Sequence, residues 1–185
     1  QNAILVEKAI KYKNRGVIGI DVAGPANPEF HLKEYQSLFE KARNAGLGIT
    51  IHTGEVDAAN DMWDALEFGK PTRIGHGIKA AYDKALMQKL AEQKVVLEVC
   101  PFSNLATKAI KDTDELQFIF STLLENNVLF TINTDWPETI QDAHLWKQFD
   151  FLREKKILTE EQLENCNRIA FESTFIKGSG LTPYL

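Results

Sequence analysis

The chain has 185 residues, enough for one domain with a core of its own. Its 26 acidic and 21 basic residues give a formal net charge of -5. This balance argues against nucleic acid and anionic membranes as partners, because both favour a basic surface. The sequence has no apolar run near the roughly 18–20 residues that cross a bilayer, and Cys100 and Cys166 lie too far apart for a CxxC pair. We therefore expect a cytoplasmic protein without a disulfide framework.

Helical and strand patterns alternate along the chain. Apolar residues at helical spacing predict helices, and short β-branched runs predict strands. In chain order we expect a helix over 2–14, a strand over 16–22, a helix over 31–45, a strand over 49–52, a helix over 57–68, a strand over 72–75, a helix over 80–93, a strand over 95–99, a helix over 114–126, a strand over 128–133, and helices over 138–155 and 159–176. Thr159 and Gln162 form a capping-box pattern at the start of the last helix.

Five apolar strands joined by helices predict an α/β fold. Strands of this kind pair in parallel and are covered on both faces. Both an open doubly wound sheet and part of a (β/α)8 barrel fit this pattern.

Polar residues follow the carboxyl end of the predicted strands. In a barrel these ends meet at one mouth, where catalytic residues come from several strands. The segments are Asp21-Val22-Ala23-Gly24, His52-Thr53-Gly54-Glu55, Gly75-His76-Gly77, Cys100-Pro101-Phe102-Ser103-Asn104 and Asn133-Thr134-Asp135-Trp136-Pro137.

Each of these residues also has a purely structural explanation. His76 fits a tight turn between two glycines, and Asp135 fits an N-cap for a helix after Pro137. Cys100 is the type of small residue that is usually buried. Ser103 and Asn104 can cap or turn the chain.

Taken together, the motifs are more specific than any one of them. In order, IDVAG, HTGE, RIGHG, EVCPFSN and NTDWP resemble the motifs of the adenosine deaminase family of the amidohydrolase superfamily, over about residues 17–140. The resemblance implies a zinc-dependent deaminase of adenosine or a related aminopurine that releases ammonia. The implied substrate is thus a purine nucleoside or a similar small molecule.

The resemblance also implies a role for each matching residue. His52 is the implied zinc ligand, and Glu55 is the implied proton donor to purine N1. His76 polarises the attacking hydroxide, and Asp135 contacts both zinc and the attacking water. Gly24 donates its backbone N–H to the purine. The carboxyl group of Glu55 must be protonated in the complex for this role.

Two departures from the family pattern change what we expect. The sequence contains no HxH motif, which in the family supplies two further zinc ligands. The zinc site is therefore expected to be incomplete in this chain, and the isolated chain to be inactive. The family motif NTDDP reads NTDWP here, so Trp136 replaces the second Asp. Tryptophan donates but does not accept hydrogen bonds, so we expect Trp136 to stack on the base, and a related aminopurine or another amino-heterocycle becomes a candidate substrate beside adenosine.

The predicted fold follows from the number of strands. We expect residues 1–185 to form the C-terminal part, about five β/α units, of a TIM-type (β/α)8 barrel. The remaining strands are expected from a longer parent chain or another chain, and without them we expect self-association through the exposed face.

Other functions stay open at this point. A catalytically inactive purine-binding or regulatory relative fits Trp136 and the absent HxH. A truncated domain with only assembly behaviour is a further alternative. Amide hydrolysis is disfavoured by Glu55 in the HTGE motif.

Overall fold

Five parallel strands form one sheet whose order follows the chain. The structure is a computed structural model that describes residues 1–24, 29–56, 59–140 and 143–176. The strands are β1 (Gly19–Val22), β2 (Gly48–Thr53), β3 (Arg73–His76), β4 (Val96–Val99) and β5 (Phe130–Ile132). Each strand pairs in parallel with the next, in the order β1-β2-β3-β4-β5.

Helices occupy most of the predicted helical segments. The α-helices are α1 (Asn2–Lys11), α2 (Gln36–Asn44), α3 (Ala59–Asp64), α4 (Lys84–Gln93), α5 (Pro101–Ala106), α6 (Thr113–Glu125), α7 (Leu145–Glu154) and α8 (Glu160–Glu172). Short 3₁₀ segments are η1 (Lys13–Arg15), η2 (Leu32–Tyr35) and η4 (Ile78–Tyr82), and η3 (Ala65–Gly69) is a π-helical turn. The capping box of α8 is confirmed, because the Gln162 backbone N–H donates to Thr159 Oγ1 and the Thr159 N–H donates to Gln162 Oε1.

Three helical segments differ from the prediction. The helix expected over 138–155 begins only at Leu145, because Thr139 and Ile140 instead close a turn on the Trp136 carbonyl. Helix α5 was not predicted at all. Residues 57–58 of the expected helix over 57–68 lie outside the described residues, and its described part is α3 and η3.

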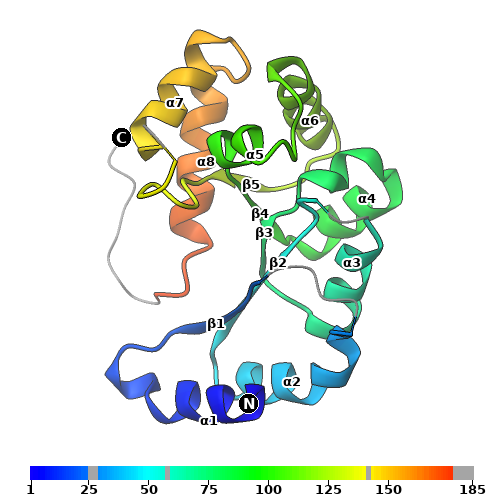
Figure 1. The fold of residues 1–185 in the computed structure, drawn as a ribbon, viewed down its shortest axis with the longest axis vertical. Helices are drawn as coiled ribbons and strands as arrows, with labels where there is room; N and C mark the ends of the chain where they lie inside the picture. Colours follow the sequence, from blue (N-terminus) through cyan, green and yellow to red (C-terminus); the bar gives the residue numbers. More distant parts are fainter. Residues whose placement is uncertain (25–28, 57–58, 141–142, 177–185) are drawn as a thin grey trace.

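The strand order decides between the two α/β architectures. A doubly wound sheet reverses its order at a switch point, whereas a barrel adds each new strand on the same side. The order here does not reverse, and right-handed crossovers then place the connecting helices on one side. Figure 1 shows α3, α4 and α6 together on one side of β2–β4. The fold is therefore about five β/α units of a TIM-type barrel.

The two faces of the sheet differ in chemistry. The face that packs on the helices is apolar and joins the two hydrophobic clusters of the core. Its strand residues are Ile20, Val22, Ile49, Ile51, Ile74, Leu97, Val99, Phe130 and Ile132. Side chains alternate along a strand, so the intervening residues occupy the inner face of the curved sheet. They are Gly19, Asp21, Gly48, Thr50, His52, Arg73, Gly75, Val96, Glu98 and Thr131.

The helices carry no membrane-spanning signal. Across the described ranges, every helix is too short or too polar to cross a bilayer.

Candidate active site

The candidate residues gather at the carboxyl edge of the sheet. His52 lies one residue before the end of β2, His76 ends β3, and Asp135 follows β5. Parallel pairing sets Thr53 beside His76 and His52 beside Gly75. As a result, the ring centroids of His52 and His76 are 5.5 Å apart, with an interplanar angle of 67°.

Left-handed backbone occurs at two of these positions. The φ angles are 63° at His76 and 61° at Asp135. This conformation costs a residue other than glycine about 1–3 kcal/mol, and such residues cluster at functional sites. Gly54, with a φ of 69°, turns the chain between His52 and Glu55. At these three positions the backbone therefore turns out of the strand conformation.

The ring of His52 is held between Asp21 and Gly75. Its Nδ1 lies 3.0 Å from Asp21 Oδ1, and a Cβ atom at position 75 would lie 2.8 Å from two carbons of the ring. Glycine at position 75 is therefore required for this ring position. The hydrogen bond to Asp21 raises the pKa of His52, against the lowering effect of burial. Because Nδ1–H donates to Asp21, Nε2 is left to bind a ligand.

Helix α5 joins Glu55 to His76. Asn104 Nδ2 lies 3.2 Å from Glu55 Oε1 and 3.1 Å from His76 Nδ1. Thr107 Oγ1, just after the helix, also donates to Glu55 Oε1 at 3.2 Å. Glu55 Oε2 is 3.7 Å from His76 Nε2, and only 6% of the His76 side chain is exposed. This burial lowers the pKa of His76, although the nearby Glu55 charge opposes it. A neutral imidazole beside a carboxyl group suits general acid–base chemistry.

Asp135 belongs to the same cluster. Its Oδ2 accepts a hydrogen bond from Ser103 Oγ at 2.6 Å. The structure does not support the simpler N-cap role, because α7 begins ten residues later and its N-cap is His144. Ser103 and Asn104 are likewise more than a turn, since both side chains contact candidate residues.

A cavity of about 210 Å³ opens among these groups. Its lining comprises His52, Gly75, His76, Glu98, Cys100, Asn133 and Asp135. Burial raises the pKa of the Cys100 thiol, which disfavours a thiolate nucleophile. The chemistry available at this cavity is therefore that of imidazole and carboxylate groups.

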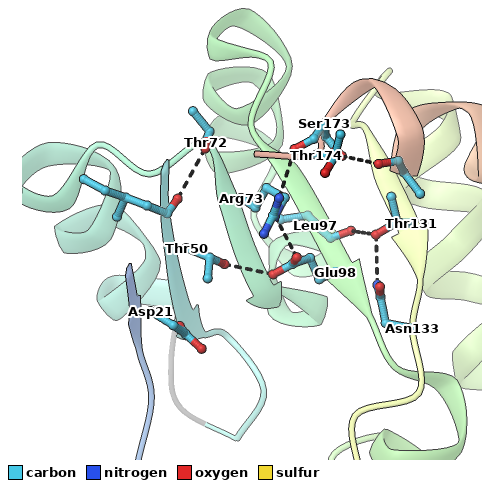
Figure 2. A network of polar contacts seen from close by, with 12 residues as sticks. Asp21, Thr50, Thr72, Arg73, Leu97, Glu98, Thr131, Asn133, Ser173 and Thr174 are labelled. Carbon is cyan, nitrogen blue, oxygen red and sulfur yellow. Dashed lines mark hydrogen bonds and ion pairs between the residues drawn. The ribbon is translucent and has the colours of Figure 1, made fainter. Parts of the chain in front are cut away.

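An ion pair on the inner face adjoins the cavity (Figure 2). Arg73 Nε lies 2.8 Å from Glu98 Oε1, and Thr50 Oγ1 donates to Glu98 Oε2 at 2.8 Å. Arg73 also donates to the Ser173 carbonyl at 2.9 Å, and its guanidinium lies 3.6 Å from the centroid of the Phe175 ring. The segment that follows α8 therefore contacts the Arg73 side of the ion pair.

Two predicted substrate-binding residues take no part in the hydrogen bonds of this cluster. Gly24 lines a second cavity of about 890 Å³ beside β1, together with Asp21 and His52. Trp136 follows Asp135, and its side chain is 63% exposed. Within the described ranges, the hydrogen bonds that join α5 to the other candidates do not extend to Gly24 or Trp136.

Comparison with known protein families gives the same result as the motifs at this edge. A family model described as adenosine deaminase matches residues 2–180. The chain belongs to the adenosine deaminase family.

Relatives of this adenosine deaminase family member share the fold. An adenine deaminase of Sinorhizobium medicae is 32% identical over 170 residues, which are 92% of this chain and 51% of that protein. The N6-methyl-AMP deaminase structure from Arabidopsis thaliana has 26% identity and a TM-score of 0.79, covering 95% of this chain and 50% of that one. At 18% identity, an amidohydrolase from Burkholderia ambifaria solved with bound Zn has a TM-score of 0.72 and covers 94% and 50% of the two chains. The chain thus spans about half the length of the relatives it matches.

The motifs imply a zinc site, and two of the residues that they name lie at one cavity. His52 and Asp135 line one cavity and have the donor chemistry of zinc ligands. A catalytic zinc normally has three protein ligands. Among the described residues, no group of three or more His, Cys, Asp or Glu side chains could hold a metal ion. His52 and Asp135 alone therefore do not complete a zinc site.

Several contacting residues were not predicted from the sequence of this family member. Thr107 and Glu98 had no assigned role, and Asp21 was seen only as a polar strand end. The CPFSN motif was the available signal for α5. The partner of Asp21 was not predictable, because it lies 31 residues away and meets it only through strand pairing.

Proposed function

We propose that this protein takes part in the zinc-dependent hydrolytic deamination of an aminopurine, with release of ammonia. The observation that supports this most is the contact of Asn104 with both Glu55 and His76, beside the cavity that His52 and Asp135 line. A carboxyl group and a neutral imidazole are thereby placed next to residues that bind metal in other proteins.

The proposed roles divide the reaction among these groups. Water adds to C6 of the purine and loses one proton to a neighbouring base, while the Glu55 carboxyl protonates the ring nitrogen N1. The proton from the water is then passed to the C6 amino group, and the C6–N bond breaks to release ammonia. The C6 hydroxyl proton returns to the Glu55 carboxylate as the C6 carbonyl forms. His76 hydrogen-bonds to the attacking water, and Asp135 orients it. A zinc ion lowers the pKa of a bound water from 15.7 to about 7 and so supplies a nucleophile at neutral pH. His52 and Asp135 are two of its proposed ligands.

The purine itself is proposed to lie over the carboxyl edge of the sheet. The backbone N–H of Gly24 donates to the base, and the exposed Trp136 ring stacks on it. The relatives support the amino-purine class without choosing one substrate, since one is named an adenine deaminase and another an N6-methyl-AMP deaminase. Adenine, adenosine and adenine nucleotides are therefore the substrates to test.

Ammonia release from these three substrates tests the proposal. In the longer parent chain, we expect Glu55→Gln to abolish most turnover while zinc content stays unchanged, and His52→Ala to lower zinc content. Glu172→Gln is a matched control, because this carboxylate pairs with Arg168 on the exposed surface of α8. Full turnover by Glu55→Gln would contradict the acid role.

A second function is binding of a purine without turnover. The replacement of the second Asp by Trp136 and the lack of an HxH motif in this sequence favour it. Calorimetry and an ammonia assay on the longer parent chain separate the two functions: purine binding with no ammonia release from any substrate supports the binding protein.

Two further expectations concern the whole molecule. We propose that residues 1–185 form one partial barrel domain and that the open sheet associates with another copy. Sedimentation at several protein concentrations tests the association, and a monomer at every concentration would contradict it.

A further inference from the structure

Asn104 is the one described residue whose side chain joins Glu55 and His76 by hydrogen bonds. It is fully buried in α5. Its amide nitrogen is 3.2 Å from Glu55 Oε1 and 3.1 Å from His76 Nδ1. Its oxygen Oδ1 is buried and has no hydrogen-bond partner in the structure.

The orientation of the amide follows from counting donors and acceptors. An amide nitrogen carries two hydrogens and no acceptor, so it serves Glu55 and His76 at once. The reversed orientation would leave the NH₂ group, with two donors, at the buried position where Oδ1 now lies without a partner. One unsatisfied acceptor costs less than two unsatisfied donors. The observed orientation is therefore the favoured one.

This orientation sets the tautomer of His76. Because the Asn104 amide donates to Nδ1, that nitrogen must be the acceptor, and in a neutral ring the proton lies on Nε2. Nε2 is the nitrogen nearer to Glu55, at 3.7 Å from Oε2.

The same contact distinguishes the two oxygens of Glu55. Oε1 accepts hydrogen bonds from both Asn104 and Thr107. A protonated carboxyl group would lose one of these bonds if its proton lay on Oε1. The proton therefore belongs on Oε2, the oxygen on the side of His76.

We propose that Asn104 is a positioning residue that holds His76 as the Nε2–H tautomer and leaves Glu55 Oε2 as the proton-carrying oxygen. The catalytic meaning of this proposal rests on the proposed deamination. The tautomer itself does not, because it follows from hydrogen bonds that exist without substrate. Both polar hydrogens would then face the same side of the site, one on the imidazole and one on the acid.

The test is the tautomer of His76 measured by long-range ¹H–¹⁵N NMR at about pH 8, above the ordinary histidine pKa of about 6.5. His76→Gln identifies its signals among those of the four histidines. We expect Nε2–H in the wild type. Asn104→Asp replaces the donor with an acceptor of the same shape, so Nδ1–H should become the main form. Thr107→Val is the matched control, because it removes a bond to Glu55 Oε1 but none to His76, and the tautomer should stay Nε2–H.

Kinetics then give the catalytic consequence. In the longer parent chain, we expect Asn104→Asp to lower kcat by about 10²- to 10⁴-fold, the range that a general acid–base group contributes, with a smaller change in KM. Asn104→Ser serves as a milder variant if Asn104→Asp does not fold, and it should give a mixture of tautomers. An Nδ1–H ring in the wild type, or an unchanged ring in both variants, would overturn the proposal. The expected tautomers without ammonia release from any purine by the longer parent chain would instead overturn the proposed function and leave the positioning role intact.

Discussion

The ion pair between Arg73 and Glu98 offers a sharp test of how the inner face of the sheet is stabilised. The side chains are 19% and 23% exposed, and the two atoms nearest each other are 2.8 Å apart. At an effective dielectric constant of about 20, this attraction is about 6 kcal/mol before the cost of desolvation, which offsets most of it. Arg73 Nε makes no hydrogen bond of normal geometry, so charge rather than a directed hydrogen bond holds the pair.

The perturbation is a double-mutant cycle of Arg73→Met and Glu98→Gln. Arg73→Met leaves the Glu98 carboxylate without its cation, and we expect the free energy of unfolding to fall by about 2–4 kcal/mol. Glu98→Gln should cost less, about 1–3 kcal/mol, because Arg73 keeps the Phe175 ring and the Ser173 carbonyl. The double variant should lose less than the sum of both, with a coupling of about 1–3 kcal/mol.

Urea unfolding measures these differences, provided that the slope m is the same in all variants. Arg153 and Glu160 are the control, because their atoms are 2.7 Å apart but their side chains are 44% and 59% exposed. Solvent and salt screen such a pair, so its cycle should be additive within error. An equally small coupling for Arg73 and Glu98 would refute the reasoning from burial.

Three further predictions concern single residues. Gly75→Ala should lower zinc affinity, because its Cβ would displace the His52 ring; unchanged metal binding by calorimetry would contradict this. Asp83 accepts the Leu86 N–H at the start of α4, and this bond holds its pKa below the usual value. Asp83→Ala should therefore cost about 0.5–2 kcal/mol at neutral pH. That cost should begin to shrink as the pH falls below about 4, where the unfolded carboxylate is protonated, and should reach its minimum below the lower native pKa, where the native carboxylate is protonated too. A cost that does not change with pH would show that the charge of Asp83 does not contribute to stability. Phe120→Ala should cost about 3–5 kcal/mol in urea unfolding, because the side chain is fully buried, and a loss below about 1 kcal/mol would show that the core refills the space.

Much of the fold was predictable because its signals are local. Short β-branched runs between helical patterns predicted all five strands, and Thr159 with Gln162 predicted the start of α8. Both depend on neighbouring residues of the chain. The helix over 138–155 was placed seven residues too early, since turn hydrogen bonds to the Trp136 carbonyl compete with helix in that segment.

The sequence by itself determined which residues could carry the chemistry of this family member. Its five motifs indicated the family, and the same motifs named His52, Glu55, His76 and Asp135. Those assignments rest on the resemblance of the motifs to those of the family, which a sequence displays directly.

The tertiary structure decided how these residues meet. Helix α5 brings Asn104 to Glu55 and His76, across 49 and 28 residues of the chain. Strand pairing sets Asp21 against His52, and the curvature of the sheet turns alternate residues onto a polar inner face. Such contacts depend on register and on the packing of distant segments, which local sequence patterns do not encode. The tautomer of His76 belongs to the same class, because it is set by a partner that only the fold supplies.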